Sequence, residues 1–240
     1  MNILAIIPAR AGSKSIKNKN LIKIKNKPLI YYPIQTAKKS NFINRIIVST
    51  DSTKIKKTAI KYGAEVPFLR PKKISGFLSK DIDYLKHCIK WLEKKDNYKP
   101  DFLVLLRPTT PFREKNIIDK AIKFFLKNKS DSLRSVSVSK ETPFKTWNKK
   151  GKFMVPLYGL KQIKKTNYPR QKLKKFYWQN GYVDIIKPST IRKYGNELGN
   201  KILFFEIQSN IFEIDYKYQL NFVNKYFQNY KIVERNLYPS

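Results

Sequence analysis

The loop that follows the first apolar segment of the chain carries the residues best suited to chemistry. The apolar run Ile3–Ile7 predicts a buried strand, which Pro8 interrupts. Small residues and regularly spaced cations then follow up to residue 20, and no acidic residue precedes Asp51. Small residues let backbone N–H groups approach an anion closely, while Lys and Arg add charge and hydrogen-bond donors. We therefore interpret residues 8–20 as a site for a highly charged phosphate ligand.

The loop differs from the two best-known phosphate-binding motifs. Gly12 is its only glycine, whereas a Walker P-loop needs two glycines before Lys-Ser/Thr and a dinucleotide fingerprint needs three. A generic polar loop is the alternative interpretation. The position directly after a strand and the absence of nearby acids favour the phosphate site.

Two pairs of acidic residues stand out among the 17 in the chain as candidate metal ligands. Asp81 and Asp83 lie at the start of a predicted helix, where side chains two residues apart diverge by about 200°. Acids at that place also suit the helix dipole. Glu213 and Asp215 lie in an extended segment, in which alternation places both carboxylates on one face. The second pair is the better candidate for Mg²⁺, and exposed acids on an edge strand are the alternative.

The inventory of nucleophiles and metal ligands is otherwise small. His87 is the only histidine and lies in a predicted helix, so a Ser-His-Asp triad or a multi-histidine zinc site is poorly supported. Cys88 is the only cysteine, which excludes an internal disulfide and is expected in a reducing cytoplasm. We therefore expect phosphoryl-type chemistry, which can run on positioning, cations and a metal.

The net charge of +34 invites a nucleic-acid-binding hypothesis, which predicts steeply salt-dependent binding. The excess is mostly Lys and is spread along the whole chain, so we interpret it as a compositional bias and expect no nucleic-acid partner. The N-terminus lacks the layout of a signal peptide, and no run of about 18 apolar residues predicts a transmembrane helix. We expect a cytoplasmic protein without membrane association.

Strands alternate with helices along most of the chain. Strands are predicted at 3–7, 45–51, 65–69, 101–106, 132–138, 179–186 (after a turn) and 201–207, and helices at 28–40, 52–62, 80–95, 117–126 and 216–226. This alternation predicts an α/β fold in three layers, α/β/α, with a mostly parallel sheet. Ligands of such sheets bind at the carboxyl ends of the strands. The loops 8–20 and 107–113 are therefore expected at one edge of the sheet.

The segment from about residue 140 to residue 180 differs from the rest of the chain. It is polar and punctuated by Pro and Gly, which predicts short extended pieces. It is too short and too polar to bury a core of its own. We interpret it as an arm inserted within a single domain that spans residues 1–240.

Seven short motifs span nearly the whole chain. They are Ala9–Lys14 with its continuation Lys19–Leu21, Val48–Asp51, Leu69–Pro71, Leu106–Arg113, Pro169–Gln171, Gln179–Gly181 and Glu213–Asp215. In type and order they resemble the motifs of the acylneuraminate cytidylyltransferase family. That family comprises the CMP-sialic acid synthetases and their relatives for legionaminic, pseudaminic and ketodeoxyoctulosonic acids.

The resemblance implies a Rossmann-like nucleotidyltransferase fold. The family usually forms a homodimer in which an arm from each subunit reaches the partner's site, so the segment 140–180 would be a dimerisation arm. The implied reaction joins CTP to an acidic 2-keto-3-deoxy sugar and gives the CMP-sugar and pyrophosphate, with Mg²⁺ neutralising developing charge. The product would supply activated sugar for surface glycans.

The resemblance also implies residue roles. The triphosphate would be held by Arg10, Lys14 and Lys19, which form the catalytic set together with Asp215. The nucleotide-binding set further includes Ala9, Ser13, Asn20 and Arg70. The sugar site would be lined by Arg107, Arg170, Gln179 and Asn180, and Mg²⁺ would be bound by Asp215 and Glu213.

Three positions depart from the family pattern. Glu213 stands where the family usually has Asp, which extends the carboxylate by one methylene. Arg107 replaces the Gln of many sialic acid enzymes, and Trp178 stands where some members carry a cation. The last two belong to the sugar-binding part, so the sequence does not name the sugar. A glycosyltransferase on a similar nucleotide-binding fold is a further alternative.

Overall fold

The computed structural model describes residues 1–209 and 211–229. They form two compact units, each described by itself. The first contains residues 1–135, 181–205 and the described residues after 210, and the second contains residues 136–180 and 206–209.

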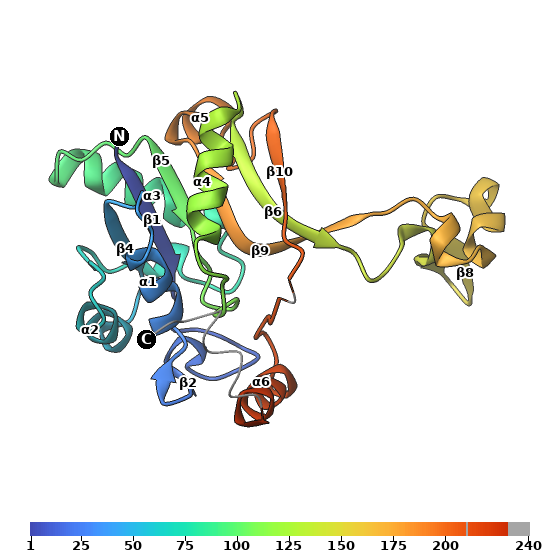
Figure 1. Ribbon diagram of the computed structural model, residues 1–240, viewed down its shortest axis with the longest axis horizontal. Coiled ribbons are helices and arrows are strands. Elements are labelled where there is room, and N and C mark those ends of the chain that lie inside the picture. Colours follow the sequence, from blue (N-terminus) through green and yellow to red (C-terminus); the bar gives the residue numbers. More distant parts are fainter. Residues whose placement is uncertain (210, 230–240) are drawn as a thin grey trace. The chain divides into compact units, whose positions relative to one another are not determined.

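A six-stranded sheet runs through the first unit in the order β10-β6-β9-β5-β1-β4 (Figure 1). The strands are β1 (Ile3–Pro8), β4 (Arg45–Ser49), β5 (Phe102–Leu105), β6 (Ser132–Val138), β9 (Tyr177–Ile186) and β10 (Ile202–Glu206). β1 pairs in parallel with both β4 and β5, so their carboxyl ends meet at one edge of the sheet. β9 pairs antiparallel with β5, with Leu103 opposite Ile186.

Six α-helices accompany the sheet within the described residues. They are α1 (Tyr31–Lys38), α2 (Thr53–Lys61), α3 (Asp81–Lys95), α4 (Ile117–Lys127), α5 (Pro188–Tyr194) and α6 (Lys217–Asn229). The 3-10 helices η1 (Lys19–Leu21) and η2 (Lys72–Ile74) and the two-residue strands β2 (Lys23–Ile24) and β3 (Lys27–Pro28) lie in the connections. No helix of this part of the chain is long and apolar enough to cross a membrane.

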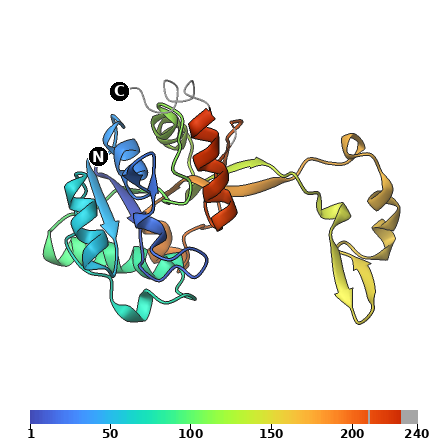
Figure 2. The ribbon, with the colours of Figure 1, turned by 90° about the horizontal axis from the view of Figure 1, so that it is seen from below.

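The sheet is covered on both faces because its strands are apolar on both faces. Leu4 and Leu103 pack against α3 through Leu85 in one buried cluster. On the opposite face, the ring of Phe102 lies 5.3 Å from that of Phe125 in α4. Figure 2 shows α3 and α4 on opposite sides of the sheet. The α/β fold with three layers and a mostly parallel sheet, predicted from the alternation of elements, is confirmed.

Local signals set several element boundaries. Ser52 caps α2, because its hydroxyl oxygen accepts a hydrogen bond from the N–H of Ile55 at 3.3 Å. Gly63 follows that helix with a φ of +90°, a conformation that glycine adopts without steric strain. The helix predicted at 52–62 is confirmed.

Other predicted elements are wrong. The strand at 65–69 is reduced to a single bridge between Ile47 and Glu65, because Pro67 has no N–H to continue the ladder. No turn separates Gln179 from the following strand, since β9 already begins at Tyr177. Helix α5 was missed, although it has two ordinary helix signals, Pro188 in its first turn and Gly195 after its end.

The second unit contains a hairpin and three short 3-10 helices. The hairpin joins β7 (Trp147–Lys150) to β8 (Phe153–Pro156), and the helices are η3 (Pro143–Lys145), η4 (Leu160–Asn167) and η5 (Arg170–Lys172). The prediction of short extended pieces is correct for the hairpin and wrong for the helical turns, whose hydrogen bonds span only three residues.

Cys88 lies in the core between α3 and the sheet and is fully buried. Burial disfavours the thiolate and raises the pKa of Cys88 to about 12. We expect the native protein at about pH 8 to resist a thiol reagent such as DTNB, and the unfolded chain in guanidinium to react with one equivalent. Rapid labelling of the native protein would contradict this placement.

Candidate active site

A cavity of about 230 Å³ lies in the first unit where the parallel strands end. The loop after β1 contributes Pro8, Arg10 and Ser13, and the loop after β5 contributes Arg107, Pro108 and Thr109. The predicted meeting of these two loops at one edge of the sheet is therefore confirmed. The remaining wall comes from Lys19 and Asn20 of η1, from Arg70 and Ser79, and from Asp81 and Tyr84 of α3.

The loop after β1 is fixed by its own backbone. The N–H of Ala9 donates to Ser49 O at 2.9 Å, and the N–H of Ala11 donates to Oδ1 of Asp51 at 2.8 Å. The side-chain amide of Asn20 donates to Arg10 O at 2.9 Å. A Cβ added at Gly12 would meet no atom within 4 Å, so the space beside the loop is open. The side chain of Asn20 thus fixes the shape of the loop by binding the main-chain carbonyl of Arg10.

Arg10, Lys14 and Arg70 place positive charge in and beside the cavity. None of them forms an ion pair with a carboxylate of the residues that the structure describes. Arg10 and Lys14 lie against the ring of Phe77, with Lys14 Nζ 4.1 Å from the ring centroid. Such cations favour an anionic ligand, because none of them is engaged in a direct ion pair within the described residues.

Arg70 is the most deeply buried of these cations, with 5% of its surface exposed. Its Nε donates to Ser49 Oγ at 3.1 Å and its Nη2 donates to Ser49 O at 2.7 Å. The guanidinium also lies 4.5 Å from the ring centroid of Tyr84. Burial lowers the pKa of Arg70 from its ordinary value. A buried guanidinium that lines a cavity and forms no direct ion pair with a described residue is a strong site for acceptor atoms of a ligand.

Lys19 and Asp215 lie almost 200 residues apart in sequence and form an ion pair, with Nζ 2.7 Å from Oδ1. The backbone N–H groups of Asp215 and Tyr216 both donate to Oε1 of Gln219, at 2.7 and 2.8 Å. The N–H of Ile214 donates to Thr109 O at 2.8 Å. The segment before α6 is thereby tied to both loops of the cavity.

A separate apolar cluster holds that segment in place. It joins the loop region before α1 to the C-terminal segment through buried Ile16, Ile24, Leu29, Tyr32, Phe112, Ile214 and Val223. The alternation predicted around residue 213 is visible here, because Ile214 is buried in the cluster while Asp215 reaches Lys19. Burial of such side chains stabilises the arrangement by about 1.5–3 kcal/mol each.

Glu213 and Asp215 are the predicted magnesium ligands. Although Glu213 is exposed as a residue, partial burial of its carboxyl group and repulsion from Asp215 raise its pKa. A divalent cation relieves such repulsion, and Mg²⁺ is commonly held by one or two carboxylates together with substrate phosphates. No group of three or more acidic, His or Cys side chains suited to a metal occurs within residues 1–209 and 211–229. The pair therefore fits a metal that shares its ligands with a phosphate substrate.

Arg107, in the wall of the cavity, belongs to an ion cluster. Its Nη1 donates to Asp184 Oδ2 at 2.5 Å, and its Nη2 donates to Asp81 Oδ2 at 2.7 Å. Arg134 Nη1 lies 2.7 Å from the same oxygen of Asp184, which is fully buried. Burial lowers the pKa of Arg107, but attraction to Asp184 and Asp81 more than offsets it, so the pKa is raised. A ligand carboxylate at Arg107 would therefore compete with two internal ones.

Sequence reasoning missed the partners of Arg107. Asp184 and Arg134 lie within strands that read as ordinary buried segments. Their signal was the occurrence of charged residues in such segments, since buried charges are almost always paired. Arg113 was noticed only as part of a motif. Its Nε donates to Tyr182 O at 2.7 Å and its Nη2 donates to Arg107 O at 3.0 Å, so Arg113 braces the loop after β5.

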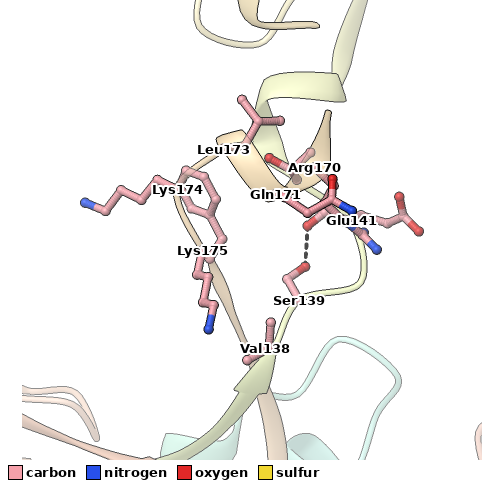
Figure 3. A pocket seen from close by; sticks show the side chains of 10 residues that line it. Val138, Ser139, Glu141, Arg170, Gln171, Leu173, Lys174 and Lys175 are labelled. Carbon is pink, nitrogen blue, oxygen red and sulfur yellow. Dashed lines mark hydrogen bonds between the residues drawn. The ribbon is translucent and has the colours of Figure 1, made fainter. Parts of the chain in front are cut away.

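The remaining predicted sugar-binding residues, Arg170, Gln179 and Asn180, belong to the second unit. Arg170 lines a cavity of about 270 Å³ there. Figure 3 shows Arg170 and Gln171 near Glu141, while Lys174 and Lys175 extend away from them. Asn180 is buried, and its amide donates to Ser137 Oγ at 2.9 Å.

Comparisons with known proteins agree on one family. A family model described as cytidylyltransferase matches residues 4–217. A pseudaminic acid cytidylyltransferase of Campylobacter jejuni is 38% identical over 133 residues, which are 55% of this chain and 57% of that protein. The post-translational flagellin modification protein B of Campylobacter coli is 30% identical over 239 residues, which are 98% of this chain and 97% of that protein. The alignment thus spans little more than half of the first relative.

One solved structure resembles the chain over nearly its full length. It is a CMP:2-keto-3-deoxy-manno-octonic acid synthetase complexed with CTP. The two structures superpose with a TM-score of 0.69 at 14% sequence identity, and the match covers 95% of this chain and 99% of the synthetase chain. At this identity the likeness shows the fold alone. It confirms the Rossmann-like fold expected from the sequence.

We expect Asp184→Ala to lower the free energy of unfolding by about 3–5 kcal/mol, because it leaves Arg107 and Arg134 buried without their shared carboxylate. Glu65→Ala is the matched control, since Glu65 pairs with Arg45 at the surface and its loss should lower stability by about 1 kcal/mol or less. Urea unfolding measures both, and equal losses would contradict the buried-cluster assignment.

Proposed function

The chain belongs to the cytidylyltransferase family, as its motifs predict, and we propose that it transfers CMP from CTP to a 2-keto-3-deoxy sugar acid. The observation that carries this proposal is a set of three cations, Arg10 and Arg70 in the cavity wall and Lys14 next to Ser13 of that wall, none of which pairs with a carboxylate of the described residues. A nucleoside triphosphate supplies the negative charge and the acceptor atoms that such a set lacks. Because the substrate is CTP, we assign the reaction to the cytoplasm.

The proposed reaction is an in-line displacement at the α-phosphorus of CTP. The anomeric hydroxyl of the sugar forms a bond to that phosphorus and loses its proton, while the bond to the β-phosphate oxygen breaks and pyrophosphate leaves. Arg10, Lys14 and Lys19 hold the triphosphate and offset charge that develops on the leaving group. Ala9 and Ser13 bring the loop backbone towards the ligand, Asn20 fixes that loop and Arg70 binds the nucleotide.

Mg²⁺ would be held by Asp215 and Glu213 together with phosphate oxygens, and it would neutralise charge on the phosphates. The ion pair of Asp215 with Lys19 keeps the carboxylate beside the cation that holds the triphosphate. Gln219 fixes the backbone at Asp215 from the other side. Both halves of the nucleotide site are therefore in place before ligand arrives.

The acidic sugar is proposed from the relatives, one of which is named for pseudaminic acid. Arg107, Arg170, Gln179 and Asn180 are the candidate sugar contacts. Arg107 already shares two internal carboxylates, whereas Arg170 forms no ion pair with a carboxylate of the described residues. We therefore propose that an Arg of this set binds the carboxylate of the sugar, with Arg107 less available for it than Arg170.

We further propose that the protein is a homodimer in which the second unit, the arm, contacts the partner. The arm exposes large apolar side chains, including Phe153 at 79%, Leu160 at 64% and Trp178 at 65% exposure. Large apolar side chains this exposed are suited to burial against a partner. Analytical ultracentrifugation would distinguish the dimer from a monomer.

Incubation with CTP, Mg²⁺ and a panel of keto-deoxy sugar acids should release pyrophosphate with at least one sugar, and mass spectrometry should detect the matching CMP-sugar. ATP, GTP and UTP in place of CTP are the controls, and they should support little release. Folded protein that releases no pyrophosphate with any sugar would contradict the proposal.

Asp215→Ala should lower kcat by about 100-fold or more and leave the thermal midpoint near that of the wild type, because Asp215 is partly exposed. Asp101→Ala is the matched control, since Asp101 directly precedes β5 and so lies at the opposite end of that strand. Unchanged turnover of the Asp215 variant would contradict its assignment as a metal ligand.

A further inference from the structure

We infer that Phe77 is a positioning residue of the triphosphate site, holding Arg10 and Lys14 together over one aromatic ring. The inference rests on the proposed function, because it concerns the cations that would bind the triphosphate. Phe77 is an exposed aromatic residue that belongs to none of the seven sequence motifs.

The geometry joins the loop around Phe77 to the loop after β1. Lys14 Nζ lies 4.1 Å from the centroid of the Phe77 ring, and Arg10 Cζ lies 5.7 Å from the same centroid. Both distances are within the range at which the ring quadrupole attracts a cation. Arg10 Nη1 also donates to the carbonyl of Gly76, which accepts the N–H of Ser79 at 3.2 Å. Ser79 in turn lines the cavity.

Charge explains why a ring suits this place better than an acid. Two cations that converge on one site repel each other, and some partner must hold them there before the ligand arrives. A carboxylate would hold them, but it would also cancel the charge and compete with the phosphates. An aromatic ring attracts the cations and leaves their full charge available.

The other cations of the site support this distinction. Lys19 and Arg107 are held by carboxylates, and Arg70 is held by the ring of Tyr84 at 4.5 Å. Arg10, Lys14 and Arg70 form no ion pair with a carboxylate in the part of the chain that the structure describes, and each of them lies on an aromatic ring.

The exposure of Phe77 argues against a role in the core. The residue is 57% exposed, and it is absent from the buried residues of the first unit. Its neighbour Leu78 is 86% exposed and serves as a matched position in the same loop. Removal of the Phe77 ring should therefore leave the fold intact and free the two cations to move apart.

The test compares Phe77→Ala, Phe77→Leu and Phe77→Tyr with the wild type. Calorimetric titration with tripolyphosphate, without metal or sugar, measures the anion site by itself. We expect Phe77→Ala and Phe77→Leu to weaken binding by about three- to tenfold, while Phe77→Tyr keeps wild-type affinity because it retains the ring. With active enzyme, the first two variants should raise KM for CTP by a similar factor and change kcat by less than about twofold.

Leu78→Ala is the control and should bind tripolyphosphate like the wild type, with thermal midpoints alike for all variants. Wild-type affinity in Phe77→Leu, or no binding of tripolyphosphate by the wild type, would overturn the inference. Weakened binding in Phe77→Ala and Phe77→Leu would support it even if no sugar acid yields a CMP-sugar. That last result would count against the proposed function alone.

Discussion

The concentration of positive charge at one cavity is the constraint on which the rest of the site depends. The cavity is lined by the cations Arg10, Lys19, Arg70 and Arg107. Because like charges repel one another, other groups must hold these side chains close together. Two kinds of partner hold the cationic side chains in place. Lys19 and Arg107 pair with carboxylates, whereas Arg10 and Arg70 lie on aromatic rings. In one part of the cavity the cations are therefore paired with carboxylates, and in another part they are available to an anionic ligand.

Hydrophobic packing brings the parts of this cavity together. The loop after β1 and the segment before α6 are distant in sequence, and the cluster around Ile16 and Ile214 joins them. The ion pair between Lys19 and Asp215 would be weak in isolation, because the Asp215 side chain is 41% exposed. It persists as a defined contact because the apolar cluster has already fixed both backbones. Apolar packing thus fixes the backbone positions at which the charged side chains of Lys19 and Asp215 meet.

Much of the fold was predictable because its signals are local. Alternating apolar segments, the Ser52 cap and Gly63 each specify their own element. The site was predictable only in part, because its partners are set by the tertiary structure. Arg107 could be identified as a site residue, but not the buried Asp184 that pairs with it across the sheet. Phe77 gave no periodic or motif signal, since its relevance comes from meeting Arg10 and Lys14 in space.

The buried cluster of Arg107, Asp184 and Arg134 has an evolutionary consequence. A lineage that replaced Arg107 with a neutral side chain would leave the fully buried Asp184 with Arg134 as its remaining partner in this cluster. A compensating substitution of Asp184 would have to occur before the substitution of Arg107 or together with it. Variation at position 107 is therefore linked to interior residues of β6 and β9, and related chains should exchange these residues as a set.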